Sequence, residues 1–337
     1  MAEAKEQFNW HPGTLLEMSG QYWQTCTLHA GVKLDLFTVI GDQSLTAKQV
    51  AAALNGNPDG LARLLNALSA MQLLTKNDNV YANTPAAAAF LSKDSSQYIG
   101  FMIMHHHHLM ASWQQMDRSV VSGRPIRDRS SGEAEWRESF LMGMFNIGMA
   151  VAPGLSRELD LSACTRLLDM GGGPGTFAIH FCLANPDLKA SVYDLATTRP
   201  FAQKTIDRFQ VSDRVEFIAG DYEEEPFPRP GEYDVAWLSH ILHGLDPDMA
   251  AQVVEKAVSA LKPGSQIFIH EFILDNTMDG PLFPALFSIN MLLGTHGGQS
   301  YSQAQLTEML RASGITKITR HPFEGPNQSG ILYGTKP

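Results

Sequence analysis

The sequence contains few cysteines, and their spacing suits no cross-link or metal motif. Cys26, Cys164 and Cys182 are the three cysteines in 337 residues, and none lies in C-x-x-C spacing. An odd number of distant cysteines argues against a disulfide framework and indicates a reducing compartment. A chain of this length needs no such support, because about 75% of its unfolded surface is expected to be buried on folding.

Charge, and positive charge in particular, is also scarce. The chain has 25 basic and 35 acidic residues, a net charge of -10, and no run rich in lysine or arginine. This balance opposes binding to nucleic acid. Charged residues make up 18% of the chain, below the roughly 25% typical of globular proteins. We therefore expect another chain to cover part of the surface.

Targeting and membrane-spanning segments are not evident. The first residues, MAEAKEQFNWHPG, lack the charged and apolar regions of a secretory signal. No apolar stretch reaches the roughly 18 residues of a transmembrane helix. The protein is expected to be soluble and cytoplasmic, with no membrane partner.

The N-terminal third predicts helices followed by a short hairpin. Thr46 and Gln49 form a capping box for a helix over 47–54, and Asn57 with Pro58 begins a second helix that ends near Met71. Two strands are expected around the turn at 77–79. This order is typical of a winged helix, but the second helix carries one basic residue where DNA recognition needs several. We expect residues 1–110 to be a winged-helix dimerisation domain.

The rest of the chain divides into a connector and an α/β domain. Residues 111–160 are expected to form Met-rich connecting helices, and 161–337 alternate short apolar strands with helices. This alternation predicts a Rossmann-like, doubly wound, mostly parallel sheet that binds ligands at the carboxyl ends of its strands. The seven expected strands are 166–170, 189–195, 214–220, 233–239, 265–274, 317–323 and 330–336.

Acidic residues follow three successive strands of this domain. The first strand ends in DMGGGPG, whose glycines fall at positions 1, 3 and 5, whereas a dinucleotide site needs positions 1, 3 and 6. Asp169 precedes these glycines, and Asp194 and Asp221 end the next two strands. A carboxylate at the second strand end can accept both ribose hydroxyls, and one at the third can accept from an adenine amino group. The register indicates a nucleoside ligand.

These motifs resemble a known family. The run LLDMGGGPGTF, VYDL, GDYEEEPFP, WLSHILHGLDPD and ALKPG is similar to class I S-adenosylmethionine-dependent methyltransferases. More narrowly, the chain resembles small-molecule O-methyltransferases of the plant caffeate and isoflavone type and of the acetylserotonin type. The N-terminal segment ending in YANTPAAAAFL matches that family's dimerisation domain. The resemblance implies a homodimer and S-adenosylmethionine as cofactor.

The resemblance also implies the residues that bind this cofactor. Asp169, Gly171 and Gly173 would contact its methionyl part, and Asp194 its ribose. Asp221 with Tyr222 would contact the adenine. The complete expected set is Asp169, Gly171, Gly173, Asp194, Leu195, Gly220, Asp221, Tyr222 and Ser239.

Two histidines follow the fourth strand of the α/β domain. His240 and His243 are three residues apart, which would place them on one helical face. A phenol with a pKa near 10 is mostly protonated at neutral pH, and imidazole is suited to remove its proton. The family's base aligns with His243, and Glu271 aligns with a glutamate that would orient it. Gly244 and Ser300 stand where the family has further carboxylates, so weaker activation is expected.

For many of the residues expected to line the acceptor pocket, ordinary packing is an alternative explanation of equal weight. The expected substrate set is Met104, His105, Met144, Asn146, His240, Asn290, Met291 and Ser300. His105 and His108 share a helical face, but no Asp, Glu or Cys completes a metal site there, and no metal is expected.

Other functions stay open at this stage. The departures at Gly244 and Ser300 permit a C- or N-methyltransferase or a non-methylating enzyme that binds the same cofactor. A winged-helix regulator would need a basic surface, and a silent scaffold would not need His243. The acceptor is expected to be a small, aromatic hydroxyl compound, and phenols, indoles, benzimidazoles, quinones and tetrapyrroles stay open as acceptor classes.

Overall fold

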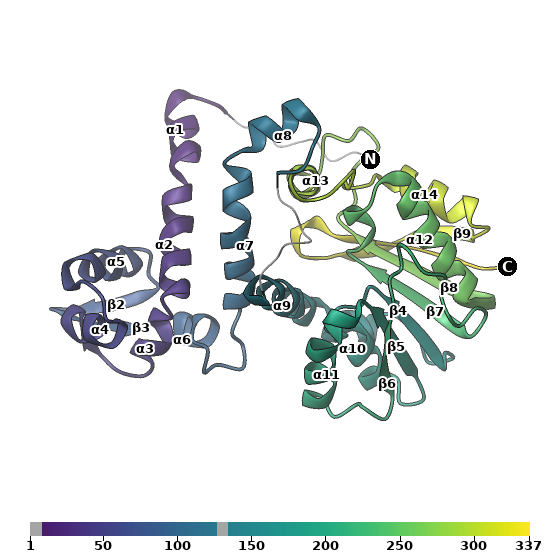
Figure 1. Cartoon of the computed structure of the whole chain (residues 1–337), viewed down its shortest axis with the longest axis horizontal. Coiled ribbons are helices and arrows are strands. Elements are labelled where there is room, and N and C mark those ends of the chain that lie inside the picture. The colour runs from purple at the N-terminus through teal and green to yellow at the C-terminus, as the bar shows by residue number, and fades with distance from the viewer. Residues whose placement is uncertain (1–8, 127–133) are drawn as a thin grey trace. The chain divides into compact units, whose positions relative to one another are not determined.

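The computed structural model describes residues 9–126 and 134–337 of the chain (Figure 1). It divides into two compact units, Met1–His107 and His108–Pro337. The first eight residues, which belong to the segment examined for a secretory signal, lie outside the described residues.

The first unit contains short helices around a three-stranded sheet. Its strand order is β1-β3-β2, with both pairs antiparallel. The elements are α1 (Pro12–Gly20), α2 (Tyr22–Lys33), α3 (Leu36–Ile40), β1 (Leu45–Thr46), α4 (Ala47–Leu54), α5 (Pro58–Ala70), β2 (Leu74–Asn77), β3 (Val80–Asn83) and α6 (Pro85–Leu91). The helix α7 (Gly100–Trp113) begins in this unit and ends in the second.

Local signals set the boundaries of this unit as expected. The Thr46 side chain accepts a hydrogen bond from the Gln49 amide and so begins α4. Asn57 accepts from the amide of Gly60 at the start of α5, which ends at Ala70. The predicted hairpin is present, and Asp78 in its turn has a φ of 51°. Its core contains Phe37, Ile40, Leu65 and Leu68, which are fully buried.

The second unit is built on a seven-stranded sheet. Its helices are α8 (Met116–Ser122), α9 (Ala134–Glu158), α10 (Thr176–Ala184), α11 (Arg199–Arg208), α12 (Pro247–Ala260), α13 (Leu282–Gly294) and α14 (Gln303–Ala312). Its strands are β4 (Arg166–Met170), β5 (Lys189–Asp194), β6 (Val215–Ala219), β7 (Tyr233–Ser239), β8 (Leu261–Glu271), β9 (Thr316–Glu324) and β10 (Gly330–Thr335). The described part of this unit also contains the 3-10 turns η2 (Ala196–Thr198), η3 (Leu242–Gly244) and η4 (Pro326–Gln328).

The predicted doubly wound sheet is confirmed. The strand order is β6-β5-β4-β7-β8-β10-β9; the pairs from β6 to β8 are parallel, and β10 is antiparallel to both neighbours. The expected bounds of the fifth strand, 265–274, were wrong. β8 begins at Leu261, which pairs with Tyr233 before a register shift, and it ends at Glu271.

Both faces of the sheet carry a buried apolar layer. On one face α9, α10 and α11 pack through residues such as Leu155, Phe181 and Ile206. On the other, α12 and α14 pack through Val254 and Leu310. Burial on both faces explains why the central strands are almost wholly apolar.

The strand order of the sheet reverses beside β4. From β4 the chain continues outward to β5 and β6, and it returns to the other side of β4 with β7 (Figure 1). Ligands of doubly wound sheets bind at such a reversal. The turns after β4, β5 and β7 therefore meet where the sequence motifs place chemistry.

One expectation about apolar stretches was wrong. Over Trp136–Glu158, α9 is long and apolar enough to cross a membrane by length and composition, and more than half of that window is buried. Its Val151 and Leu155, and Leu159 directly after its end, belong to the core described above. Packing within the second unit therefore accounts for its apolar character.

Candidate active site

The glycine-rich turn after β4 bends sharply toward the end of β5. Gly171, Gly173 and Gly175 all have positive φ, and the amide of Gly171 donates to the carbonyl of Tyr193 at 2.7 Å. A Cβ at position 171 would lie 2.6 Å from the Ile241 side chain. Glycine is needed there both for the left-handed backbone and for the close approach of the turn after β7.

Asp194 connects the two turns through backbone donors. Its Oδ2 accepts from the Gly173 amide at 2.8 Å. Its Oδ1 accepts from the Leu195 amide at 2.7 Å and from the Thr198 hydroxyl at 2.9 Å. Burial raises the pKa of Asp194 above its usual value, and the charge of Asp221 adds to this effect. The Leu195 side chain is exposed.

Asp169 is a second buried acid in the same region. It is 1% exposed, and its Oδ2 accepts a weak hydrogen bond from the Ala178 amide at 3.3 Å. Burial raises the pKa of Asp169 to about 7, and the negative charge of Asp194 contributes. The two carboxylates leave this end of the sheet electronegative.

The turn after β6 completes this group of residues. The Gly220 amide donates to the Asp194 carbonyl at 3.0 Å, and Asp221 accepts from the Glu223 amide at 2.9 Å. A Cβ on Gly171 would meet the ring of Tyr222 at 3.3 Å, which places that ring beside the glycine turn. The structure thus brings together the predicted cofactor residues from three strand ends.

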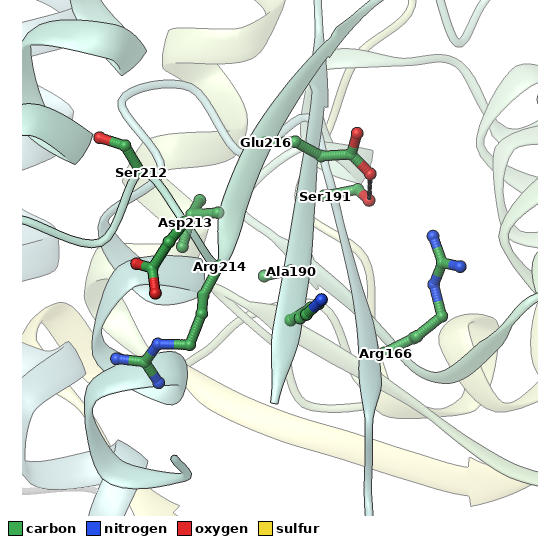
Figure 2. Close-up of a pocket in the computed structure, with 9 residues that line it drawn as sticks. Arg166, Ala190, Ser191, Ser212, Asp213, Arg214 and Glu216 are labelled. Carbon is green, nitrogen blue, oxygen red and sulfur yellow. Dashed lines mark hydrogen bonds between the residues drawn. The ribbon is translucent and has the colours of Figure 1, made fainter. Parts of the chain in front are cut away.

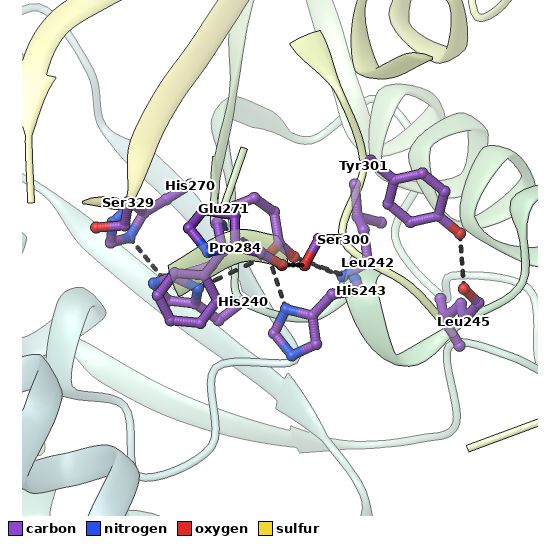
Figure 3. Close-up of polar contacts among 12 residues, drawn as sticks. His240, Leu242, His243, Leu245, His270, Glu271, Pro284, Ser300, Tyr301 and Ser329 are labelled. Atoms are coloured by element: carbon purple, nitrogen blue, oxygen red, sulfur yellow. Dashed lines mark hydrogen bonds and ion pairs between the residues drawn. The ribbon is translucent and has the colours of Figure 1, made fainter. Parts of the chain in front are cut away.

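His243 and Glu271 form a hydrogen-bonded pair (Figure 3). The Nδ1 atom of His243 lies 2.7 Å from Oε2 of Glu271. The amides of Leu242, His243 and Phe272 also donate to this carboxylate, at 2.9, 3.3 and 3.3 Å. Burial alone would raise the pKa of Glu271, but His243 and the surrounding donors outweigh it and hold this pKa well below its usual value.

His240 also lies close to this carboxylate, but through a backbone conformation that the sequence did not predict. The expected shared helical face was wrong, because His240 has a left-handed backbone with φ 56° and His243 lies in the 3-10 turn η3. Nδ1 of His240 nevertheless lies 3.7 Å from Oε2 of Glu271. Burial lowers the pKa of His240, although Glu271 opposes the effect.

The other polar candidates are engaged in the interior. The Ser239 hydroxyl pairs with Nδ1 of His270 at 3.0 Å. Ser300 is fully buried and donates to the Pro284 carbonyl at 2.8 Å, so its side chain is not bonded to His243. Asn290 is nearly buried and accepts from Trp113 at 3.2 Å.

The apolar substrate candidates are spread over both units. Met291 is 1% exposed and belongs to the interior of the second unit. Met144 and Asn146 are half-buried on α9. Met104 and His105 belong to the first unit, where Met104 packs against the core of that unit.

The sequence analysis did not identify the three phenylalanines beside the histidines. The ring of Phe287 lies 4.7 Å from that of His243, and Phe272 lies 4.3 Å from His240, both measured between centroids. Phe283 packs against Phe272 at 4.9 Å. Phe283 and Phe287 are four residues apart on α13, and this spacing was the available signal.

A surface pocket at the opposite end of the sheet is charged but internally satisfied (Figure 2). It is lined by residues that begin β4, β5 and β6, including Arg166 and Arg214. Arg214 donates to carbonyls at the end of α10, and Glu216 accepts from Ser191 at 2.8 Å and pairs with Arg229. This pocket is explained by structural contacts.

Known proteins match both parts of the chain. Residues 107–316 match the model of an O-methyltransferase domain, and residues 16–93 match that of an O-methyltransferase dimerisation domain. A 3-hydroxy-5-methyl-1-naphthoate 3-O-methyltransferase from Streptomyces sahachiroi is 30% identical, over 96% of this chain and 95% of that protein.

Further comparisons agree with these matches. The S-adenosyl-L-methionine-dependent methyl transferase PigF of a Serratia strain is 27% identical, over 94% of this chain and 93% of that protein. A solved O-methyltransferase family protein from Burkholderia thailandensis superposes with a TM-score of 0.87 at 26% identity, covering 97% of this chain and 98% of that one.

Proposed function

Since the chain belongs to the S-adenosylmethionine-dependent O-methyltransferase family, we propose that it methylates a hydroxyl group of a small aromatic acceptor with His243 as general base. The predicted family, enzyme class, fold and cofactor are thereby confirmed. The observation that carries the proposed mechanism is the 2.7 Å contact between Nδ1 of His243 and Glu271.

The electronegative turns suit a cationic cofactor. S-adenosylmethionine supplies, when bound, a methyl group on a positively charged sulfur. Burial raises the pKa of both Asp169 and Asp194, and a neighbouring carboxylate adds to each shift, that of Asp194 for Asp169 and that of Asp221 for Asp194. A nearby positive charge would stabilise their ionised forms. We assign the methionyl part to Asp169, Gly171 and Gly173.

The remaining cofactor contacts follow from the same turns. Asp194 has used three of the roughly four acceptor directions of a carboxylate, and it is assigned to the ribose together with Leu195. The adenine is assigned to Gly220, Asp221 and Tyr222, with Ser239 close to the adenosine.

Glu271 would make His243 a base. It accepts the Nδ1 proton, so the lone pair of the neutral ring is left on Nε2, where it can take the hydroxyl proton of the acceptor. The imidazolium that forms is stabilised by the charge of Glu271. Ser300 contributes no such contact, and Glu271 is therefore assigned this role alone.

The aromatic side chains beside the base favour a flat acceptor. Phe272 and Phe287 lie against the two histidines with centroid separations of 4.3 to 6.1 Å, and Phe283 packs against both of these phenylalanines. Aromatic pairs prefer separations of about 4.5–7 Å, so these rings would pack an aromatic acceptor well. Met144, Asn146, His240, Asn290, Met291, Met104, His105 and Ser300 stay predictions for the acceptor site.

The expected quaternary structure is a homodimer. The first unit matches a dimerisation domain, and it exposes large apolar side chains on α1 and α2, among them Leu16 at 74% and Trp23 at 68%. We assign residues 1–110 to a winged-helix dimerisation domain, 111–160 to a connector and 161–337 to cofactor binding. A cytoplasmic location, without nucleic-acid or membrane partners, is proposed on the cysteine and charge content.

The test is transfer of a labelled methyl group. The protein is incubated with S-adenosylmethionine labelled on its methyl group and a panel of hydroxylated aromatic acids and polycyclic phenols. We expect label on the hydroxyl oxygen of at least one acceptor and none on the same compound with that hydroxyl already methylated. Label on carbon or nitrogen would instead support the C- or N-methyltransferase, and no transfer to any class would contradict the proposal.

A further inference from the structure

Nδ1 of His240 has no role in the arrangement described so far. The atom is buried, and among residues 9–126 and 134–337 nothing forms a hydrogen bond to it. Its nearest charged neighbour is Oε2 of Glu271 at 3.7 Å. A buried polar atom without a partner is costly, and so is a left-handed backbone at a histidine. Both features point to a ligand that uses this nitrogen.

His240, His243 and Glu271 together form a set of metal-ligating atoms. One ligand atom from each of the three lies within 4.8 Å of the other two. It is the one such cluster found among the described residues, and the histidine run on α7 does not form another. Two imidazoles and one carboxylate are a common ligand set of zinc.

The geometry needs little adjustment to hold such an ion. Ligand atoms at about 2.1 Å from a tetrahedral zinc lie about 3.4 Å apart. The His243–Glu271 and His240–Glu271 separations of 2.7 and 3.7 Å bracket that value. The side chains of His243 and His240 are 12% and 16% exposed, against 3% for Glu271, so a fourth ligand such as water would reach the ion from the side of the two imidazoles.

We propose that His240, His243 and Glu271 bind a divalent transition metal such as Zn²⁺, and that the bound ion blocks the base. If the metal takes the lone pair of Nδ1 of His243, the single proton of the neutral ring moves from Nδ1 to Nε2 by exchange with solvent, so the ring neither gains nor loses a proton overall. Nε2 then carries a hydrogen and has no lone pair for the acceptor hydroxyl. The inhibitory effect rests on the proposed function, whereas metal binding does not.

Metal binding is tested with Co²⁺, whose visible absorption reports four-coordinate geometry. The full chain carries His105→Gln and Cys26→Ser, which remove one histidine of the α7 run and the exposed thiol. We expect one tightly bound Co²⁺ per chain, displaced by Zn²⁺. In the same background His240→Asn should weaken Zn²⁺ binding at least about tenfold and abolish the four-coordinate spectrum.

Asparagine is chosen at position 240 so that the variant folds and a loss of metal binding reflects the missing imidazole. Asparagine tolerates the positive φ at position 240, and His240→Gly is a second variant that adopts this backbone freely. Unchanged affinity and spectrum in a folded His240→Asn protein would overturn the proposal. The proposal would also be overturned if the protein with His240, His243 and Glu271 unchanged bound no Co²⁺ at a ratio of one ion per chain.

Inhibition is measured separately on the unmodified chain. Zn²⁺ should lower its methyl transfer at least about tenfold, with recovery after a chelator is added. Stimulation by Zn²⁺, or occupancy without inhibition, would contradict the proposed effect. If no acceptor is methylated under any condition, the proposed function fails, and the cobalt spectrum still decides whether the metal site exists.

Discussion

Two carboxyl groups at the carboxyl end of the sheet are equally buried, but their pKa values are shifted in opposite directions. Asp169 and Glu271 are 1% and 2% exposed. Asp169 has one long amide hydrogen bond and an acidic neighbour, and burial raises its pKa to about 7. Glu271 receives three amides and one imidazole, and its pKa is lowered. Burial alone therefore does not set the charge, and the number of donors does.

The difference in hydrogen-bond donors divides the site into two halves, one whose carboxylates lack a positive partner among the described residues and one whose carboxylate has its donors. The cofactor half, around Asp169 and Asp194, has excess negative charge without a positive partner in the described contacts. The proposed base half, around His243 and Glu271, has hydrogen-bond donors that already offset the charge of its carboxylate. A cationic ligand would offset the charge of the first half, whereas the carboxylate of the second needs no further partner.

The largest expected effect is the dependence of stability on pH that the buried carboxyl group of Asp169 causes. Its folded-state pKa of about 7 lies above the usual value of 3.8, so the folded state retains a proton that the unfolded state loses. The stabilising contribution is full below about pH 4 and is lost as the pH rises toward 7, by up to about 4 kcal/mol. Asp169→Asn should remove this dependence, as measured by denaturant unfolding of the cofactor-free protein between pH 5 and 8. If the free energy of unfolding of the wild type changed with pH in parallel with that of Asp169→Asn, the raised pKa of Asp169 would be refuted.

The next effect would break the cofactor half alone. Asp194→Ala removes the acceptor that joins the turns after β4 and β5. We expect the affinity for S-adenosylhomocysteine, measured by calorimetry, to fall at least about 100-fold, equivalent to about 2.7 kcal/mol. Asp248→Ala, an acid in the first turn of α12, is the control and should bind as the wild type does.

A smaller effect would weaken the base half alone. Glu271→Gln keeps an acceptor for the Nδ1 proton of His243 but removes the charge that stabilises the imidazolium. Turnover is expected to fall roughly 10–100-fold, with calorimetric cofactor affinity unchanged. An equal loss of affinity and turnover would mean that the two halves are not separate.

The smallest effect is expected at Ser300, because its hydroxyl is bonded to the Pro284 carbonyl and not to the base. Ser300→Ala should change turnover less than about threefold while lowering the free energy of unfolding by about 1 kcal/mol. Steady-state kinetics and denaturant unfolding distinguish these results. A large loss of turnover at unchanged stability would assign Ser300 to the reaction.

The same contrast explains what the sequence could predict. The proposed cofactor half is held by backbone amides of turns that directly follow strands, and the strand and glycine patterns placed Asp194 at the end of β5 and Asp221 just after β6, where the structure has them. All seven strands of the sheet were also predicted, because burial on both faces gives each of them an apolar run.

The base half was harder because it depends on conformations and distant contacts. A left-handed backbone at His240 and a 3-10 turn at His243 replaced the expected helix face. Phe283 and Phe287 reach this region through packing of α13 near the end of β8; their spacing marks one helical face but does not show what that face packs against. Phe272 directly follows Glu271 at the end of β8.

The central claim is that His243 removes the acceptor proton while the cofactor is held independently. It is tested most directly by measuring the single-turnover rate and the cofactor affinity of His243→Ala together, with His321→Ala as a histidine control outside the cluster. We predict a rate at least about 100-fold below wild type and an unchanged affinity for S-adenosylhomocysteine. A rate within about threefold of wild type would contradict the account, since general-base catalysis contributes at least about 100-fold.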